Sequence, residues 1–170
     1  MTSFDLLCMK KIVLTYGTFD LFHTGHLSLL NRLKALGDEL IVGVTTDEFN
    51  VLRGKQTIFG FEDRIQIIRN LKCVDLAIAM QNAEQKANDI CRYGVSIFGM
   101  GNDWEGRFDD LRIHCEVIYL PRTENISSTY IKKLLEVLDR THISDLRKVS
   151  DPTISIVESF NEQVARKDDW

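Results

Sequence analysis

The sequence predicts an α/β protein with a Rossmann-like, doubly wound sheet of about five parallel strands, helices on both faces and a C-terminal helical extension. Short apolar runs rich in β-branched residues recur along the chain, and segments with helical periodicity separate them. A chain of 170 residues, 44% of them hydrophobic, is long enough to bury one core. Because strands and helices alternate regularly, we expect parallel strands joined by right-handed crossovers.

Five strands are predicted from these apolar runs, and we expect all five to be buried. They lie at residues 11–16, 40–45, 74–80, 95–100 and 115–120. Three helices are predicted between them, because apolar residues recur at helical spacing. Their stripes consist of Leu29, Leu30, Leu33 and Leu36, of Phe61, Ile65, Ile68 and Leu71, and of Ala83, Ala87, Ile90 and Cys91. Gly37 and Gly94 are expected to end the first and third helices.

Composition divides the chain into three parts. Residues 10–138 carry the strand and helix pattern and form the expected main domain, which follows an N-terminal extension at residues 1–9. Residues 139–170 are expected to form a polar linker and then a helix that starts near Pro152. The apolar stripe of that helix is thin, and it fits equally well against the sheet of its own chain or against a partner subunit.

Charge and cysteine content exclude several classes of protein. The formal net charge of −4 argues against a protein that coats nucleic acid. No stretch reaches the roughly 18 apolar residues of a membrane span, and the N-terminal residues lack a secretory pattern, so we expect a cytoplasmic protein. The cysteines are far apart and form no CxxC pair, which favours buried, reduced thiols over a zinc site. They are Cys8, Cys73, Cys91 and Cys115.

The segment "GTFDLFHTGH", residues 17–26, follows the first strand, where parallel α/β proteins bind ligands. Gly17 permits a tight turn, and Gly25 lets a ligand approach the next helix. His23 and His26 are three residues apart, so both can present donors near the helix N-terminus. These groups predict a cradle for phosphate oxygens. A metal-binding pair, which lacks a nearby third ligand, and structural histidines are the alternatives.

The segment "PRTENISST", residues 121–129, follows the fifth strand and repeats this chemistry. Arg122 offers paired donors that suit phosphates, and the hydroxyl groups of Ser127, Ser128 and Thr129 can add more. A serine that only caps the next helix is the simpler alternative. If both segments bind anions, two helix N-termini hold one triphosphate.

Together the two segments resemble signatures of the cytidylyltransferase family, in the HxGH nucleotidyltransferase superfamily: H-x-G-H and R-T-x-G-I-S-T-T. Further similarity at "TTDEFN", "GNDWEGRF" and "YLPRTE" points to the branch that uses glycerol 3-phosphate, over about residues 10–135. Residues 10–138 are then the nucleotidyltransferase domain. The chain departs from the signature at Asn125, where glycine is usual, and at Ser128, where threonine is usual. Asparagine tolerates positive φ and serine keeps the hydroxyl, so we expect the loop geometry to survive.

The resemblance implies that the phosphate of glycerol 3-phosphate attacks the α-phosphorus of CTP, giving CDP-glycerol and pyrophosphate without a covalent enzyme intermediate. It also implies Mg2+ carried by the triphosphate, and a homodimer. The expected catalytic residues are His23, His26, Lys55 and Arg122. The expected nucleotide-binding residues are these four with Gly17, Thr18, Phe19, Gly25, Asp103, Thr123, Ile126, Ser127, Ser128 and Thr129.

The expected acceptor-binding residues are Arg53, Lys86, Asp47 and Arg64. Arg53 and Lys55 lie in a segment, residues 51–61, that we expect to be a mobile loop able to close over phosphates. The family has lysine where Arg53 stands, which alters reach and geometry. Simple surface solvation is the alternative for such cations, and Arg64 alternatively pairs with a neighbouring carboxylate.

Three other functions are alternatives to the cytidylyltransferase reaction. The same chemistry fits an adenylyltransferase, or a cytidylyltransferase for another small phosphorylated alcohol or sugar. A nucleotide sensor without activity would share the fold, although both anion sites and the loop cations favour catalysis. A nicotinamide dehydrogenase is disfavoured because no G-x-G-x-x-G follows the first strand.

Overall fold

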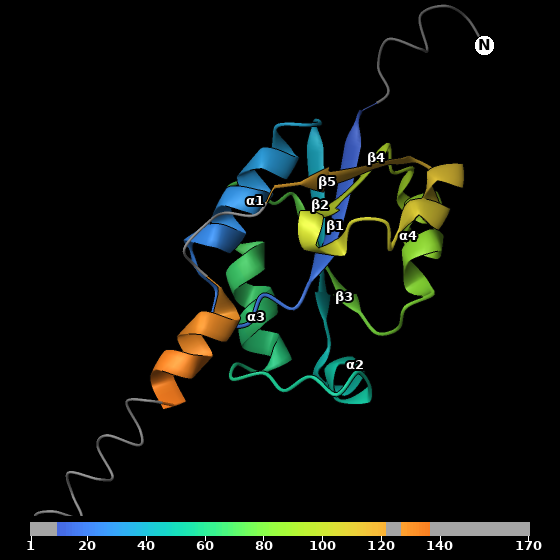
Figure 1. Cartoon of the computed structure of the whole chain (residues 1–170). Helices are drawn as coiled ribbons and strands as arrows, with labels where there is room; N and C mark the ends of the chain where they lie inside the picture. Colours follow the sequence, from blue (N-terminus) through green and yellow to red (C-terminus); the bar gives the residue numbers. More distant parts are fainter. Residues whose placement is uncertain (1–9, 122–126, 137–170) are drawn as a thin grey trace, which may run out of the picture. The chain divides into compact units, whose positions relative to one another are not determined.

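The computed structural model describes residues 10–121 and 127–136. The chain divides into two compact units, with the boundary between Ser128 and Thr129. The first unit is built on a sheet of five parallel strands in the order β3-β2-β1-β4-β5 (Figure 1). The strands are β1 (Ile12–Gly17), β2 (Glu39–Thr45), β3 (Leu76–Met80), β4 (Ile97–Gly101) and β5 (Glu116–Leu120). The predicted α/β class with a parallel sheet is therefore confirmed.

Helices cover both faces of the sheet. The α-helices of the first unit are α1 (Thr24–Lys34), α2 (Asp47–Leu52), α3 (Phe61–Arg69) and α4 (Gln85–Tyr93), and the short 3-10 helices are η2 (Asn102–Trp104) and η3 (Asp109–Ile113). A further helix, over residues 128–136, belongs mostly to the second unit. Helices α1 and α3 lie on one face and α4 on the other (Figure 1). Leu33 and Ile68 accordingly belong to one buried cluster, and Ile90 belongs to a second cluster on the opposite side.

The strand order reverses between β1 and β4. Strand β1 pairs with β2 on one side and with β4 on the other, although β4 comes much later in the chain. In an open parallel sheet, ligands bind beyond the carboxyl ends of the strands at this reversal. The turns that follow β1, β2 and β4 therefore define the region of the candidate site.

Several details differ from the expectations. Strands β3 and β5 are only partly buried because they are the sheet edges, and Leu76 is 41% exposed. Ala83 lies before α4, which begins at Gln85. Residues 51–52 of the expected mobile loop belong to α2. The Thr46 hydroxyl caps the start of this helix by accepting a hydrogen bond from the Phe49 N–H. Cys91 is exposed, not buried.

The ends of the helices follow the glycines as expected. Helix α4 ends at Gly94, whose φ of 61° is left-handed and so suits glycine. Helix α1 ends at Lys34, shortly before Gly37, where a Cβ would lie 2.4 Å from the Lys11 carbonyl oxygen. The predicted extension at residues 1–9 and the linker and helix at residues 139–170 lie outside the described residues. Within the described part, no helix has the length and apolar character needed to cross a membrane.

Candidate active site

The turn between β1 and α1 is strained and tightly packed. A Cβ on Gly17 would lie 2.7 Å from the Phe19 ring, so glycine makes room for this ring. Phe19 and Leu21 have φ values of 54° and 48°. This left-handed conformation costs a non-glycine residue about 1–2 kcal/mol and persists only where neighbouring contacts hold it. Thr18, Phe19 and Asp20 are all buried, which keeps the turn in place.

His23 and His26 form a stacked pair at the N-terminus of α1. Their ring centroids are 3.9 Å apart and their planes are inclined by 19°. His23 is the N-cap, and its Nδ1 accepts a hydrogen bond of 3.1 Å from the Gly25 N–H. In the neutral ring this bond assigns the proton to Nε2, which is then a donor. The His26 ring packs on Phe19 and Phe22, with centroids 5.4 and 5.5 Å away, so the turn sets its orientation.

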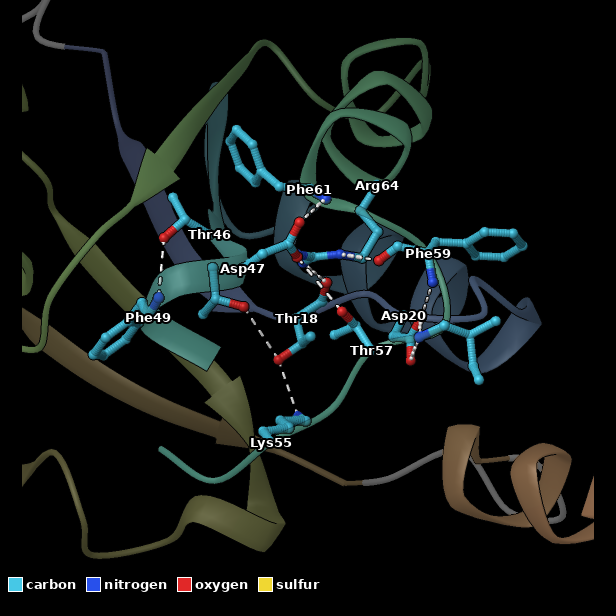
Figure 2. Close-up of polar contacts among 12 residues, drawn as sticks. Thr18, Asp20, Thr46, Asp47, Phe49, Lys55, Thr57, Phe59, Phe61 and Arg64 are labelled. Atoms are coloured by element: carbon cyan, nitrogen blue, oxygen red, sulfur yellow. Dashed lines mark hydrogen bonds and ion pairs between the residues drawn. The ribbon is translucent and has the colours of Figure 1, made fainter. Parts of the chain in front are cut away.

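Arg64 of α3 joins three segments of the site (Figure 2). Its Nη1 donates to the Thr18 carbonyl at 2.6 Å, its Nε donates to the Phe59 carbonyl at 3.0 Å, and its Nη2 pairs with Asp47 at 2.7 Å. The whole residue is 0% exposed. The alternative in which Arg64 pairs with a carboxylate is therefore the one observed. Because the guanidinium has no exposed surface, we assign Arg64 to positioning the loop and not to acceptor contact.

The Asp47 carboxylate, at the start of α2, faces the same cluster. It accepts from the Phe61 N–H at 2.8 Å and from the Thr57 hydroxyl at 3.5 Å, besides pairing with Arg64. Burial raises the pKa of Asp47, but the hydrogen bonds from Phe61 and Arg64 outweigh burial and hold the pKa below its ordinary value. Asp47 therefore stays ionised and engaged with protein donors, which favours a positioning role for it as well.

Asp20 connects the β1–α1 turn with two other segments. Its carboxylate accepts from the N–H groups of Ile58 and Phe59, each at 3.0 Å (Figure 2). Its main-chain carbonyl accepts a hydrogen bond of 2.8 Å from the Ser128 hydroxyl. The side chain of Asp20 is buried. One residue thus ties the turn to residues 58–59 and to the start of the helix over 128–136.

Replacing Asp20 with alanine is expected to release the loop, because the N–H groups of Ile58 and Phe59 lose their acceptor. Hydrogen exchange at these two amides should rise about tenfold or more, which corresponds to the loss of one or two buried hydrogen bonds. Asp63→Ala, an exposed acidic position on α3, is the matched control. Unchanged exchange in the Asp20 variant would show that other contacts hold this segment.

Lys55 and Arg53 make different contacts. The Lys55 Nζ donates to the Thr18 hydroxyl at 2.9 Å, and that hydroxyl lies 3.3 Å from the Thr45 hydroxyl (Figure 2). The Arg53 guanidinium lies over the Phe49 ring, 5.3 Å from its centroid. The two cations are therefore placed by specific contacts, with Lys55 at the β1–α1 turn.

Lys86 of α4 lies between two aromatic rings. Its Nζ is 5.7 Å from the Tyr16 centroid and 5.4 Å from the Phe108 centroid. Burial lowers the pKa of Lys86, and the positive charge of Arg53 lowers it further. The charges of Arg53 and Lys86 therefore act on each other. An anion close to both cations would be favoured.

Asp103 and Trp104 lie in η2, directly after β4. A Cβ on Gly101 would be 2.5 Å from Asp103 Oδ1, so glycine lets this carboxylate approach the backbone. Trp104 is half-buried against the second cluster, 5.8 Å from the Phe108 centroid. Trp104 therefore packs as a core residue does, while the exposed Asp103 carboxylate lies just beyond the carboxyl end of β4.

The second motif is described only in part. Ser127 and Ser128 are half-buried, and Ser128 opens the helix over 128–136 and donates to Asp20 as described above. Thr129 is exposed and begins the second unit. Three predicted nucleotide ligands lie outside the described residues: Arg122, Thr123 and Ile126. In the described ranges, no group of three His, Cys, Asp or Glu side chains is arranged to hold a metal ion.

Three residues near Lys86 were absent from the predicted site. Tyr16, Phe108 and Asp89 surround or support this lysine, as shown by the Tyr16–Asp89 hydrogen bond of 2.7 Å and the ring contacts. The available signals were weak. Asp89 lies four residues after Gln85 on the predicted third helix, and Tyr16 ends the predicted first strand.

A parallel sheet whose order reverses beside a helix N-terminus, with two imidazoles and several cations at that edge, defines a nucleotide-binding α/β protein. The sequence model of the family described as Cytidylyltransferase-like matches residues 14–134. The chain belongs to this family, as the two signatures predicted.

Relatives of known name agree with the family assignment. Glycerol-3-phosphate cytidylyltransferase of Bacillus subtilis (strain 168) is 51% identical over 125 residues, covering 74% of this chain and 96% of that protein. The Staphylococcus aureus (strain NCTC 8325 / PS 47) protein of the same name is 48% identical over 127 residues, covering 75% and 96%. A solved structure of the lipopolysaccharide core biosynthesis protein from Thermoplasma volcanium GSS1 matches with a TM-score of 0.60 and 28% identity, covering 68% of this chain and 100% of that one.

Proposed function

We propose that this protein transfers CMP from CTP to glycerol 3-phosphate, giving CDP-glycerol and pyrophosphate. Relatives named Glycerol-3-phosphate cytidylyltransferase, 51% and 48% identical over almost their whole length, support the reaction and both substrates. The single structural observation that carries the proposal is the stacked pair of His23 and His26 at the N-terminus of α1, beside the reversal in strand order. Donors at this place suit the phosphates of a nucleotide.

The proposed reaction is one in-line displacement. A phosphate oxygen of glycerol 3-phosphate forms a bond to the α-phosphorus of CTP, and the bond from that phosphorus to the bridging oxygen breaks. Pyrophosphate leaves with the electron pair. Because both groups are reactive once aligned, the protein mainly positions them and stabilises charge. His23 Nε2 and the His26 ring would donate to phosphate oxygens as negative charge builds, with no proton transferred.

The remaining nucleotide contacts are proposed from position and resemblance. Lys55, already at the β1–α1 turn, would neutralise the triphosphate, with Arg122 from the second motif. The exposed Asp103 would bond the ribose or the cytosine amino group. The turn would approach the nucleotide through its backbone, and the second motif would add its hydroxyl and N–H groups. The residues so assigned are Gly17, Thr18, Phe19, Gly25, Thr123, Ile126, Ser127, Ser128 and Thr129.

Magnesium is proposed as an ion that arrives with CTP. Phosphate oxygens are hard ligands of the kind that Mg2+ prefers, so the triphosphate itself can hold the ion. Such an ion supplies neutralisation of the pyrophosphate leaving group. On the family resemblance, we also propose a homodimer that works in the cytoplasm, and sedimentation velocity of the full chain tests the dimer.

The acceptor phosphate is proposed to bind between Arg53 and Lys86. In support, the Arg53 charge contributes, after burial, to lowering the pKa of Lys86, and a dianion near both cations would offset this effect. Asp47 and Arg64 would act indirectly by holding α2, α3 and the loop together. Arginine in place of the usual lysine at position 53 would still bind phosphate, through paired N–H donors.

The reaction is tested by incubating the purified protein with Mg2+, CTP or ATP, and a panel of phosphates that includes glycerol 3-phosphate, phosphocholine and ribitol 5-phosphate. The expected result is the formation of pyrophosphate and CDP-glycerol in equal amounts, as measured by 31P NMR. Adenylylated products would indicate a different donor, and another CDP-alcohol would indicate a different acceptor. CTP binding without pyrophosphate release would indicate a sensor and overturn the proposal.

Acceptor use is expected to decline at alkaline pH earlier than an ordinary lysine would allow. The pKa of Lys86 is lowered from 10.5, so the ammonium loses its proton as pH rises through that lowered value, and its attraction for phosphate is lost. The measurement is kcat/KM for glycerol 3-phosphate against pH. In Lys86→Arg the alkaline limb should move to higher pH, because arginine stays charged. If kcat/KM declined at the same alkaline pH in Lys86→Arg, the titration would belong to another group.

A further inference from the structure

We propose that Asp89 holds Tyr16 so that the Tyr16 and Phe108 rings form a seat for the Lys86 ammonium, and that this seat raises acceptor affinity. We call these two rings the Lys86 seat. The inference rests on the proposed function, in which Lys86 binds the acceptor phosphate. Asp89 and Tyr16 are thereby positioning residues, since they act through Lys86.

A buried hydrogen-bond network fixes the first ring of the seat. The Tyr16 phenol donates to Asp89 Oδ2 at 2.7 Å, and the Gln85 Nε2 donates to the same oxygen at 2.9 Å. Gln85 Nε2 also donates to the Ala79 carbonyl at 2.7 Å, which anchors the network to β3. Tyr16 and Asp89 are each 5% exposed. A buried carboxylate is costly unless it is paired, so both donors are needed.

Burial and the bond to Asp89 raise the pKa of Tyr16 far above its ordinary value. The phenol therefore remains a donor at any working pH, and the network does not switch off. The Tyr16 ring also packs against strand β2. Tyr16 pairs with Gly43 of β2, and a Cβ at Gly43 would be 2.1 Å from the Tyr16 ring. The ring thus packs on bare backbone.

The second ring of the seat is anchored in a similar way. The Phe108 N–H donates to the Tyr119 hydroxyl at 3.1 Å, and that hydroxyl donates to Asp109 at 2.9 Å. Strand β5 and the start of η3 therefore fix the position of Phe108. Each ring of the seat is held by a tyrosine hydroxyl that donates to a carboxylate.

The seat positions the ammonium without cancelling its charge. Aromatic faces attract a cation that has lost part of its hydration. A phenol that donates to a carboxylate is polarised by it, which makes the Tyr16 face more negative. Among the described ion pairs, none joins a carboxylate to Lys86, although the charges of Glu84 and Asp110 act on it from beyond ion-pair distance. In the described residues, no direct ion pair therefore neutralises the ammonium, which can attract an incoming phosphate.

The expected effect is confined to the acceptor. Tyr16→Phe and Asp89→Asn each remove the polarising bond, and Phe108→Leu removes the second ring without touching Asp89. Each should raise KM for glycerol 3-phosphate about fivefold, with kcat and KM for CTP changed less than about twofold. Asn88→Ala, at an exposed position of α4 next to Asp89, is the matched control.

A purely structural role for Asp89 predicts a different pattern. It would lower the free energy of unfolding and reduce kcat/KM for both substrates in parallel, or leave the kinetics unchanged. Phe108→Leu keeps the test decisive if Asp89→Asn does not fold. An unchanged acceptor KM in Phe108→Leu and Tyr16→Phe would overturn the inference.

The same series separates this inference from the proposed function. Lys86→Met is measured first, and it should raise the acceptor KM strongly. If Lys86→Met has no effect, the proposed acceptor site fails. If Lys86→Met raises the acceptor KM but the Tyr16 and Phe108 variants do not, only the inference about the Lys86 seat fails. In the Lys86→Met background, Tyr16→Phe should cause no further change in acceptor KM, because the seat acts through the missing ammonium.

Discussion

Replacing His26 with alanine is expected to lower kcat for CDP-glycerol formation by about 100-fold to 1,000-fold, with the Kd for CTP changed less than about threefold. The reason is that a donor to a phosphate oxygen gains strength as charge builds in the transition state, an effect of about 3 kcal/mol for comparable oxyanion donors. Pyrophosphate release measures turnover, and equilibrium titration of CTP measures binding.

His23→Ala is expected to show the same loss of turnover and, in addition, lower stability. His23 caps α1 through the Gly25 N–H, and loss of a cap costs about 1 kcal/mol of unfolding free energy. His23→Asn should restore much of the stability but not the turnover. His114→Ala, which alters a histidine near β5 and beside Cys91, is the control. Equal losses in CTP binding and turnover would mean that the histidines only anchor the nucleotide.

Replacing Arg64 with methionine is expected to lower the free energy of unfolding by about 2–4 kcal/mol and to reduce kcat/KM for both substrates. Methionine fills a similar volume, but the Thr18 carbonyl, the Phe59 carbonyl and the Asp47 carboxylate lose the hydrogen bonds that Arg64 donates. Urea denaturation followed by circular dichroism measures stability. Arg69→Met, an exposed position at the end of the same helix, should change it by less than about 0.5 kcal/mol.

The loss of unfolding free energy at acid pH gives a second test of the contacts between Arg64 and Asp47. Because the folded-state pKa of Asp47 is lowered from 3.8, its contribution is present above that value and is lost as pH falls below it toward the folded pKa. In Arg64→Met this acid-dependent loss should shrink, since the guanidinium is one of the donors that lower the pKa. An acid limb of the same size in both proteins would assign it to other carboxylates, such as Asp75, whose pKa is also lowered.

Local sequence pattern predicted most of the fold, because buried strands and amphipathic helices follow short-range periodicity. Strand β1 ends one residue beyond its expected end, and helix α1 ends three residues before Gly37. Helix α2 escaped prediction because its six residues give too little periodicity, and its stability depends on the Thr46 cap. Exposure of the edge strands depends on sheet order, which no single strand encodes.

The site was predictable where chemistry lies in a contiguous motif. The two histidines follow a strand and open a helix, so their neighbourhood could be inferred from spacing. The contacts of Arg64 with Thr18, of Asp20 with Ile58 and of Tyr16 with Asp89 instead join residues 46, 38 and 73 positions apart. Such pairings depend on tertiary packing, which explains why Arg64 was expected at the acceptor although it is enclosed in the protein.

The three hydrogen-bonded connections of Asp20 have a thermodynamic consequence. Residues 51–61, which carry the proposed acceptor cation Arg53 and the proposed triphosphate cation Lys55, are linked through buried Asp20 to Ser128, a proposed triphosphate donor. If occupancy of one substrate site stabilises Asp20 in place, the other site is partly ordered before its own substrate arrives. Reciprocity then requires that CTP strengthen glycerol 3-phosphate binding by the same factor by which glycerol 3-phosphate strengthens CTP binding.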